Sequence, residues 1–373
     1  MKKTIRLMTE ISYNMRELQA AKASFEQANP GVHIEIEQAN DYFEIMRALQ
    51  SDQAPDLIET GGLQAGNPDG VFIDLNPYVN ESAGLRDDLY AGLLRVAGHG
   101  GVLTSLPTEV SPPLMMYDKE KFDRAGLAYP TDEWTWEDMM ALAERLTIRD
   151  EQGIASQFGL GLGIDIEWFE SFVMRGGGRY ISPDGSTSRG YIDSALTIEA
   201  FELIVDVFRK HRVARLPDEP CTAGSWREEN AMMFSFIWNA NDLLRDQPEE
   251  RYGVVGLPNI PGGQQANMVY MGGAGITSAS AEPDLAWRFL RHYILECHSW
   301  TPPVSRSQAE QRGLMSHPIY SRYMQELDHV QISGFFMNKK WNASRQLINE
   351  DIRRMIVEGA DVARTLQSWT RYA

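Results

Sequence analysis

The first 60 residues switch repeatedly between the two periods of regular secondary structure. Apolar residues recur at the helical spacing in some stretches and alternate with polar residues in others. Strand, helix, strand, helix, strand in this order is typical of a parallel sheet with helices on its faces, so the predicted fold class is α/β. The predicted strands cover residues 5–8, 32–39 and 54–60, and the predicted helices cover residues 16–28 and 42–51.

Polar or small residues follow each of these predicted strands. Tyr13 follows the first strand, Asn40 and Asp41 follow the second, and Gly61 and Gly62 follow the third. Parallel sheets bind ligands at the carboxyl ends of their strands. We therefore expect these loop residues to be candidate ligand contacts, although polar loop residues are more often simply solvated.

Two consecutive prolines interrupt the chain in SLPTEVSPPLMMYDKEKFDRAGL, residues 105–127. Pro112 and Pro113 cannot donate backbone hydrogen bonds, and each holds the preceding residue extended. The segment is predicted to be neither a helix interior nor a central strand, but a stiff crossing between two domains. Glu109 lies on this crossing, where its carboxylate could reach a ligand or point outward.

Two further proline-rich junctions, at residues 258–263 and 299–307, divide the rest of the chain. At 373 residues the chain is long enough for two or three domains. Three crossings are expected when each of two α/β domains is assembled from non-contiguous pieces. The predicted domains are residues 1–110 plus 259–305, and residues 111–258 plus 306–373.

The middle of the chain gives two more local predictions. Residues 181–192, ISPDGSTSRGYI, are expected to form a turn between two short strands. Residues 194–210 predict a helix with one apolar face. The residues assigned to that face are Leu196, Ala200, Leu203 and Val207.

Charge and composition exclude several classes of protein. The net charge of −17 disfavours nucleic acid as a partner, because phosphate binding needs clustered basic residues. No apolar run is long enough to span a bilayer. Cys221 and Cys297 show neither CxxC nor Cys/His spacing, so no metal site is predicted; buried thiols are expected, and a bridge between them stays open.

The N-terminus, MKKTIRLMTEIS, has two lysines followed by only a short apolar patch. A signal peptide needs a longer apolar core and a small-residue cleavage site. The sequence therefore fits either a cytoplasmic protein or a mature exported protein whose signal has been removed.

Sequence motifs of the common enzyme classes are absent. The chain has no GxxxxGK[ST], HExxH or GxSxG motif, and GLGLG at residues 159–163 lacks the spacing of a dinucleotide-binding loop. Asp165 with Glu167 or Glu109 could serve as a glycosidase pair, but nothing selects them for that role. No catalytic residue and no cofactor are predicted.

Several segments together resemble the extracellular solute-binding proteins of carbohydrate ABC importers, the family that includes maltose-binding protein. The matching segments are FEQANPGVHIEIE, APDLIE, FIDLNPYV, the stretch from LYAGLLRV to MALAERLT, AMMFSFIWNANDLL, YGVVGLPNIPGG and GGAGITSASAEPDLAWRFLRHYIL. They follow the order of the family and cover nearly the whole chain.

The resemblance implies a two-lobed periplasmic-binding-protein-like fold of type II, in which each lobe is a sheet flanked by helices and hinge crossings join the lobes. It also implies that the cleft closes over a carbohydrate without chemistry, and that the protein is a monomer outside the cytoplasm. ABC transporter permease subunits are the implied partners.

The resemblance also places three aromatic residues against the sugar. Trp238 follows an apolar run in FSFIWNAND, Trp168 precedes the glycines of MRGGGRYI, and Trp341 stands in NKKWNASRQL. Sugars offer flat C–H faces to aromatic rings, and hydroxyls to carboxylates and amides. Each tryptophan has an alternative role in helix packing.

Polar and small residues complete the predicted site. Asp165 and Glu167 could accept sugar hydroxyls, and Gly272 and Gly273 would let backbone amides approach a ligand, although a tight turn needs glycine equally. Two other functions stay open: a cytosolic sugar-sensing domain of a regulator, and a glycoside-active enzyme.

Overall fold

The computed structural model describes residues 2–51, 53–61, 70–246 and 250–373, without the side chains of Tyr42, His99, Leu243 and Asp246. The chain divides into two compact units, each assembled from separate pieces. Unit 1 comprises Met1–Ser111, Val269–Tyr320 and Val330–Ile332, and unit 2 comprises Pro112–Met268, Ser321–His329 and Ser333–Ala373.

The chain passes between the units at points that differ in part from the predicted ones. It leaves unit 1 after Ser111, directly before the two prolines, and returns at Val269, further along than the predicted return at 259. It stays in unit 1 as far as Tyr320, beyond the predicted boundary at 305, and then crosses twice more around Val330–Ile332. The proline-rich junction at 299–307 therefore lies within unit 1.

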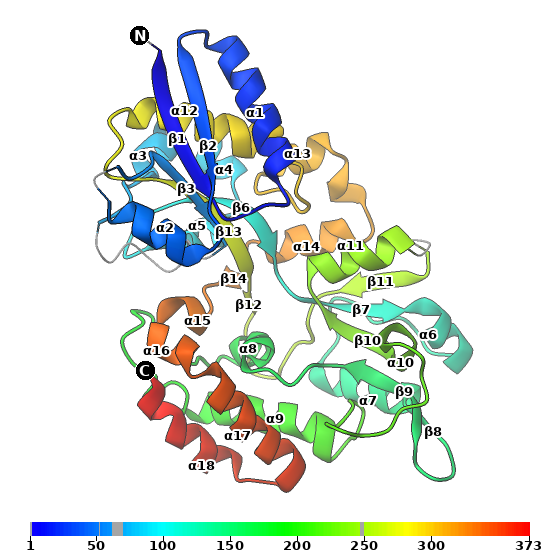
Figure 1. The fold of residues 1–373 in the computed structure, drawn as a ribbon. Helices are drawn as coiled ribbons and strands as arrows, with labels where there is room; N and C mark the ends of the chain where they lie inside the picture. The colour runs from blue at the N-terminus through cyan, green and yellow to red at the C-terminus, as the bar shows by residue number, and fades with distance from the viewer. Residues whose placement is uncertain (1, 52, 62–69, 247–249) are drawn as a thin grey trace. The chain divides into compact units, whose positions relative to one another are not determined.

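Unit 1 is built on a five-stranded sheet in the order β2-β1-β3-β13-β6 (Figure 1). Strand β1 pairs in parallel with β2 and β3, and β13 pairs antiparallel with β3 and β6. The strands of unit 1 are β1 (Lys3–Thr9), β2 (Val32–Gln38), β3 (Leu57–Thr60), β4 (Gly98–His99), β5 (Val102–Leu103), β6 (Leu106–Ser111), β13 (Tyr270–Ile276) and β14 (Val330–Gln331).

Helices flank the sheet of unit 1, and apolar faces hold them there. Phe25 of α1 meets Phe289 of α12 edge to face, with ring centroids 5.3 Å apart, and both side chains are buried. The helices are α1 (Met15–Ala28), α2 (Tyr42–Leu49), α3 (Asn76–Glu81), α4 (Leu85–Asp88), α5 (Ala91–Val96), α12 (Pro283–His292) and α13 (Arg306–Gln311), with a π-helical turn at Tyr293–Cys297 and a 3₁₀ turn at Leu314–Ser316.

Unit 2 has its own five-stranded sheet, in the order β11-β7-β10-β9-β8. Strand β10 pairs in parallel with β9 and antiparallel with β7. The strands of unit 2 are β7 (Leu114–Asp118), β8 (Ile148–Arg149), β9 (Ala155–Gly161), β10 (Asn230–Ser235), β11 (Tyr252–Val255) and β12 (Asn267–Met268). Two mixed sheets flanked by helices confirm the predicted α/β class.

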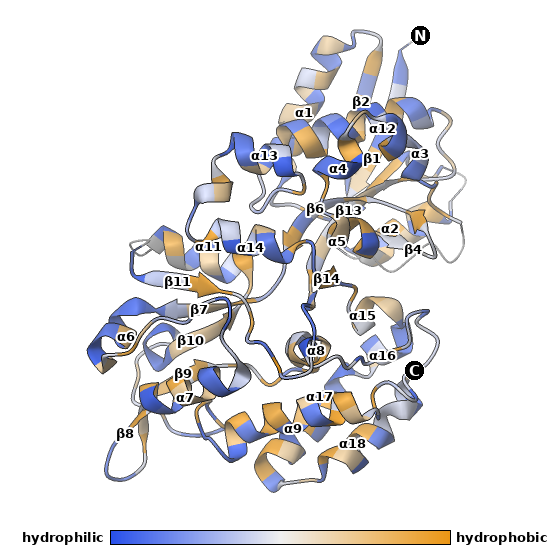
Figure 2. Ribbon diagram, turned by 180° about the vertical axis from the view of Figure 1, so that it is seen from behind, coloured by the Kyte–Doolittle hydropathy of each residue, from blue (hydrophilic) through white to orange (hydrophobic). Residues whose placement is uncertain are grey.

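The helices of unit 2 are amphipathic, and Figure 2 shows α9 and α17 with both hydrophobic and hydrophilic residues. Helix α7 begins with a capping box, in which Thr135 and Asp138 satisfy each other's backbone N–H groups. The helices are α6 (Lys119–Ala125), α7 (Trp136–Leu146), α8 (Ile166–Arg175), α9 (Ala195–Arg209), α10 (Trp226–Glu229), α11 (Ile237–Asp246), α14 (Tyr320–Glu326), α15 (Gly334–Met337), α16 (Lys339–Ala343), α17 (Arg345–Glu358) and α18 (Val362–Ser368), with a 3₁₀ turn at Trp369–Tyr372.

The structure corrects the prediction for residues 105–127. Strand β6 before the prolines is an edge strand, as a proline-bounded segment favours, but β7 directly after them is a central strand between β11 and β10. Pro112 and Pro113 lie outside both strands, so they remove no ladder hydrogen bond from β7. The influence of the prolines is therefore more local than predicted.

Two other local predictions were wrong in part. Residues 181–192 contain no strand, because the Asp184 carboxylate accepts hydrogen bonds from Ser182 and Ser186 and folds the segment into a polar turn. Helix α9 forms as predicted, but Leu196 is 48% exposed. The face of α9 that packs inward is carried by Ala200, Phe201, Ile204, Val205, Val207 and Phe208.

Candidate functional site

Glu59 lies at the carboxyl end of β3, in the middle of the unit 1 sheet. Its side chain is fully buried, and Oε1 accepts hydrogen bonds from Asn14 Nδ2 at 3.0 Å and from the Tyr293 hydroxyl at 2.8 Å. Burial raises the pKa of Glu59 to about 7, although these hydrogen bonds act in the opposite direction. A buried acid with such a pKa exchanges its proton near neutral pH.

Glu109 on β6 is a second buried acid in unit 1. It is 8% exposed, and its Oε2 accepts a hydrogen bond from the hydroxyl of Tyr13, a residue that is itself 67% exposed. Burial raises the pKa of Glu109 to about 7, and the charges of Glu59 and Glu17 act in the same direction. The structure thus joins Tyr13 and Glu109, two predicted site residues that are far apart in sequence.

Two further carboxylates stand beside these acids. Glu10 accepts hydrogen bonds from Thr60 Oγ1 and, at 3.2 Å, from the backbone N–H of Gly61. Glu17 on α1 accepts from the hydroxyl and the backbone N–H of Ser299. We refer to Glu10, Glu17, Glu59 and Glu109 as the glutamate cluster.

The glycines of β13 allow close approach of strands beside this cluster. A Cβ atom on Gly272 would lie 2.6 Å from Thr108 Oγ1, so a larger residue would push β13 away from β6. Gly273 is paired with Thr60 on one side and Pro107 on the other. Both glycines are buried and serve strand packing around the glutamate cluster.

The other predicted residues of unit 1 have local roles. Asp41 caps α2, because its Oδ1 accepts from the Glu44 N–H at 2.8 Å. Asn40 donates to the Glu44 carboxylate at 2.9 Å. Both follow β2 as predicted, while Gly62 lies outside the described residues.

Unit 2 holds a cavity of about 270 Å³ at the carboxyl ends of the parallel strands β9 and β10. Binding sites of open α/β sheets lie at this edge. We refer to the cavity as the tryptophan pocket. Its lining includes Trp168, Trp226, Arg215, Glu229, Asn230, Ser235 and Asn239.

Trp168 is half-buried and lies among other aromatic rings. Its ring centroid is 5.9 Å from that of Phe234 and 6.0 Å from that of Phe236. Phe236 in turn stacks on Trp238 at 4.5 Å with an interplanar angle of 11°. Trp238 is 40% exposed, so the structure brings two predicted stacking residues into one aromatic row that ends at the surface.

The backbone near Trp168 is shaped for its ring. A Cβ atom on Gly163 would lie 2.5 Å from the indole, so only glycine lets the loop after β9 lie against the ring. On the other side of the pocket, Asn230 Nδ2 donates to the Trp226 carbonyl at 2.9 Å. The pocket therefore combines aromatic faces with a few polar groups, as sugar sites do.

Asp165 and Glu167 lie near Trp168 in sequence, but both carboxylates have cationic partners. Asp165 caps α8 and lies 3.0 Å from Arg345 Nη2. Glu167 is 4% exposed and lies 2.7 Å from the same guanidinium. Their position favours a structural role in joining α8 to α17.

Trp341 is fully buried, in contrast with the other two predicted tryptophans. Its ring lies 5.5 Å from that of Tyr180, in the core of unit 2. Because no part of this ring is exposed, the structure supports the alternative role in packing, and Trp341 is not part of the site assembled here.

Several residues of the site were not predicted as ligand contacts, among them Glu10, Glu59, Trp226 and Trp300. Glu10 and Glu59 are close in sequence to Tyr13 and Gly61. They could have been predicted, because ligands bind at the carboxyl ends of parallel strands. Trp300, whose ring is 6.1 Å from that of Tyr13, and Trp226 come from segments distant in sequence and have no local signal.

The residues that the structure describes contain neither a candidate metal site nor a candidate membrane span. Among them, no group of three or more His, Cys, Asp or Glu side chains could hold a metal ion. Within the same residues, no helix is both long and apolar enough to cross a bilayer. Cys221 and Cys297 are free thiols, both partly exposed.

Comparisons with known proteins agree with this fold. Residues 7–295 match the family of bacterial extracellular solute-binding proteins. The sugar-binding protein MalE from the phytopathogen Xanthomonas citri superimposes with a TM-score of 0.82 at 17% identity, covering 99% of this chain and 96% of that one. The cyclic alpha-maltosyl-1,6-maltose binding protein from Arthrobacter globiformis gives 0.79 at 17% identity, with 100% and 98% coverage.

A third similar structure is an ABC substrate-binding protein from Listeria monocytogenes in complex with cycloalternan. It has a TM-score of 0.73 at 21% identity and covers 100% of this chain and 98% of its own. The family match shows that this chain belongs to the bacterial extracellular solute-binding proteins. The family and these neighbours are solute-binding proteins, not enzymes. The neighbours have the two-lobed architecture that the sequence predicted.

Proposed function

We propose that the protein is the carbohydrate-binding subunit of an ABC importer. The observation that carries this proposal is the tryptophan pocket, where aromatic faces and polar groups meet at the carboxyl ends of β9 and β10. Family membership supports a solute as the ligand. The three neighbours described above, which bind sugars or are named for them, support a carbohydrate, and an oligosaccharide in particular.

In this proposal each unit supplies a different kind of contact. The sugar stacks on Trp168, Trp226 or Trp238 of unit 2, while the glutamate cluster of unit 1 accepts hydrogen bonds from its hydroxyls. Such a ligand shifts the population towards a closed state, provided that it binds that state better than the open one. Bond making and breaking are not part of this function.

The transport role also implies a place and partners. We propose that the protein works outside the cytoplasm as a monomer and presents the bound sugar to membrane permease subunits of an ABC transporter. The family, whose members are extracellular, supports this location. The net charge of −17 supports the proposal that nucleic acid is not a partner.

A thermal-shift screen of the full chain against mono- and oligosaccharides tests this proposal, with polyols and amino acids as controls. A ligand at 100 times its dissociation constant adds about 2.7 kcal/mol of stability, which raises the melting temperature by a few degrees. We expect one class of saccharide to do so and to be recovered intact. A flat response to every saccharide would contradict the proposal.

A further inference from the structure

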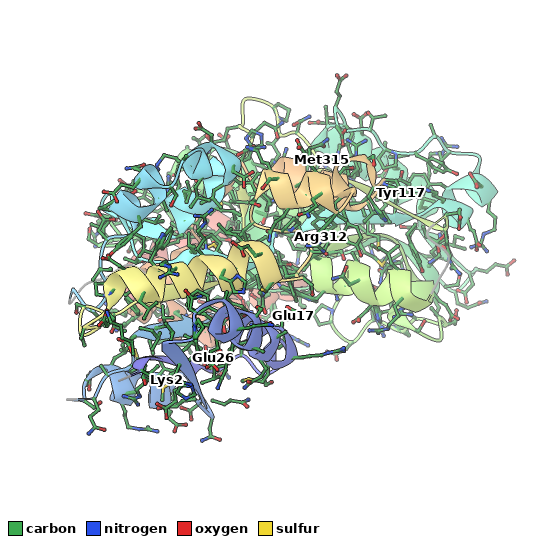
Figure 3. All side chains as sticks on the ribbon, turned by 90° about the horizontal axis from the view of Figure 1, so that it is seen from above. Lys2, Glu17, Glu26, Tyr117, Arg312 and Met315 are labelled. Atoms are coloured by element: carbon green, nitrogen blue, oxygen red, sulfur yellow. The ribbon has the colours of Figure 1, made fainter. Side chains whose placement is uncertain are left out.

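The glutamate cluster carries more negative charge than nearby cations neutralise. In the described part of the chain, no ion pair within 4 Å involves Glu10, Glu17, Glu59 or Glu109. The cation that acts on Glu17 is Arg312, and both residues are labelled in Figure 3. The Arg312 guanidinium already donates to the carbonyls of Ser299 and Trp300, at 2.9 and 2.8 Å.

Neighbouring titratable groups add no positive charge to the cluster. His298 is 8% exposed, and burial lowers its pKa to about 4, so its imidazole is neutral at physiological pH. Desolvation and the acids that they face raise the pKa values of the Tyr13 and Tyr293 hydroxyls, so these groups also stay neutral. The groups that face Glu59 and Glu109 are therefore neutral or acidic.

Glu109 is the member of the cluster that contacts the exposed Tyr13, and one of its carboxylate oxygens has no donor. Its side chain is more than nine-tenths buried, and Oε1 has no hydrogen-bond partner. Oε2 accepts from Tyr13, an exposed residue of the loop that also carries Glu10, so the buried carboxyl group is linked directly to a surface side chain. A buried carboxylate oxygen without a donor is costly unless a ligand supplies the donor.

We propose that the ligand is an amino sugar, a carbohydrate with a free ammonium group that binds at Glu109 beneath Tyr13. This inference rests on the proposed function and specifies its ligand. An ammonium supplies three donors and one positive charge, which is what the cluster lacks. The rings of Tyr13 and Trp300, 6.1 Å apart, add aromatic faces that attract a cation.

Binding at the cluster should also release protons if the ligand is an amino sugar, but not if it is a neutral sugar. Glu59 and Glu109 have pKa values of about 7, so each holds a proton for much of the time at slightly acidic pH. An ammonium nearby favours the ionised carboxylate and lowers these pKa values. Binding of an amino sugar should therefore release protons to the buffer.

Sets of sugars that differ only at the amine test the proposal. The probes are glucosamine, glucose and N-acetylglucosamine, the corresponding galactose and mannose sets, and the chitosan disaccharide with cellobiose and diacetylchitobiose. Calorimetry at about pH 6.5, near the raised pKa values, in two buffers of different ionisation enthalpy measures affinity and proton release together. We expect a free-amine sugar to bind at least about tenfold more tightly than its neutral counterparts and to release protons.

Two variants test whether the charge of Glu109, rather than a change in folding, controls binding. Glu109→Gln should weaken binding of the amino sugar at least about tenfold and reduce proton release, and it should weaken binding of the neutral counterpart by less. Glu35→Gln, on the exposed side of β2, is the matched control and should bind as the wild type does. Melting temperatures of both variants, measured without sugar, show whether they fold.

The outcomes distinguish this inference from the proposed function. Two results would overturn the amino-sugar inference and leave the carbohydrate-binding function standing. In the first, neutral sugars bind as tightly as the amino sugar or more tightly. In the second, the amino sugar binds Glu109→Gln as tightly as the wild type. If no saccharide of either panel binds, both are overturned.

Discussion

The glutamate cluster of unit 1 and the tryptophan pocket of unit 2 occupy the same place in their respective sheets. Glu59 lies at the carboxyl end of the parallel strand pair formed by β1 and β3, and the pocket lies at the ends of β9 and β10. Their chemistry differs. The cluster offers buried acids with pKa values of about 7, whereas the pocket offers indole faces with amide and hydroxyl groups at its edge.

This difference shows what the fold determines and what the side chains determine. The ends of parallel strands provide a binding edge in both units, whatever residues stand there. The residues then decide the type of contact: stacking in unit 2, and charge and hydrogen bonding in unit 1. Changes in the pocket should therefore reduce affinity for every accepted sugar, and changes in the cluster should alter selectivity and pH dependence.

The largest expected effect comes from Trp168→Ala. Removing a half-buried indole from the lining of the pocket should weaken sugar binding by about 2 kcal/mol, or roughly 30-fold in dissociation constant. Calorimetry measures this loss, and Trp168→Phe should retain part of the affinity. Tyr129→Ala, which removes a 40% exposed aromatic ring of unit 2 outside the pocket lining, is the control. Equal losses from Trp168→Ala and Tyr129→Ala would contradict a role for the pocket.

Glu59→Gln should change the pH dependence of stability. The folded state holds the Glu59 proton up to a pKa of about 7, whereas the unfolded chain releases it near the ordinary value of 4.5. The folded state thus binds more protons in this window, and the contribution of Glu59 to stability is lost as the pH rises from about 4.5 to about 7. Relative to Glu59→Gln, the wild type should lose at least about 1 kcal/mol across this range.

Urea unfolding at pH 4.5 and pH 7.5, chosen to bracket roughly that range, measures the effect. Glu35→Gln, which removes an exposed carboxylate of unit 1, should keep the wild-type dependence. A Glu59→Gln protein whose stability falls as steeply with pH as the wild type would show that Glu59 ionises freely in the folded state.

Trp238→Ala tests whether the aromatic row extends the pocket. Trp238 is 40% exposed and stacked on Phe236, so its loss should weaken sugar binding by at least about 1 kcal/mol with little change in stability. Calorimetry with the sugar found in the screen measures the change. Unchanged affinity would remove Trp238 from the site and leave it as a surface residue that covers Phe236.

Tyr13→Phe should have the smallest effect. It removes the hydroxyl that donates to Glu109 and keeps the ring, at a cost of about 0.5 to 1.5 kcal/mol in stability. The pKa of Glu109 should rise further, because this hydrogen bond lowers it. Tyr78→Phe, which removes a comparable bond to Asp284, is the control. Denaturant unfolding measures stability, and an unchanged pKa of Glu109 would contradict the coupling.

The sequence predicted the framework of each unit because local periodicity carries that information. The switch between helical and alternating patterns before Thr60 defined β1, α1, β2, α2 and β3 within a few residues. The prediction of two strands within residues 181–192 failed because hydrogen bonds to the side chain of Asp184 take the place of strand pairing. A turn of this kind leaves no periodic signal in the sequence. The prediction that Leu196 lies on the buried face failed because the packing of α9, and not its sequence pattern alone, decides which face is buried.

The candidate site was less predictable than the framework. Tyr13 and Glu109 were named separately, but their hydrogen bond depends on the pairing of strands that are distant in sequence. The burial of Trp341 was equally unpredictable, because a tryptophan that stacks on a ligand and one that packs against Tyr180 look alike in a sequence. Trp226 and Trp300 join the site only through tertiary structure.

Calorimetric titration of the full chain with the best saccharide from the screen tests the central claim most directly, when it compares the wild type with Glu109→Gln and Trp168→Ala. If one carbohydrate is bound by contributions from both units, each variant should bind at least about tenfold more weakly while remaining folded. Wild-type affinity in both variants would contradict the account, because neither the glutamate cluster nor the tryptophan pocket would then contact the sugar.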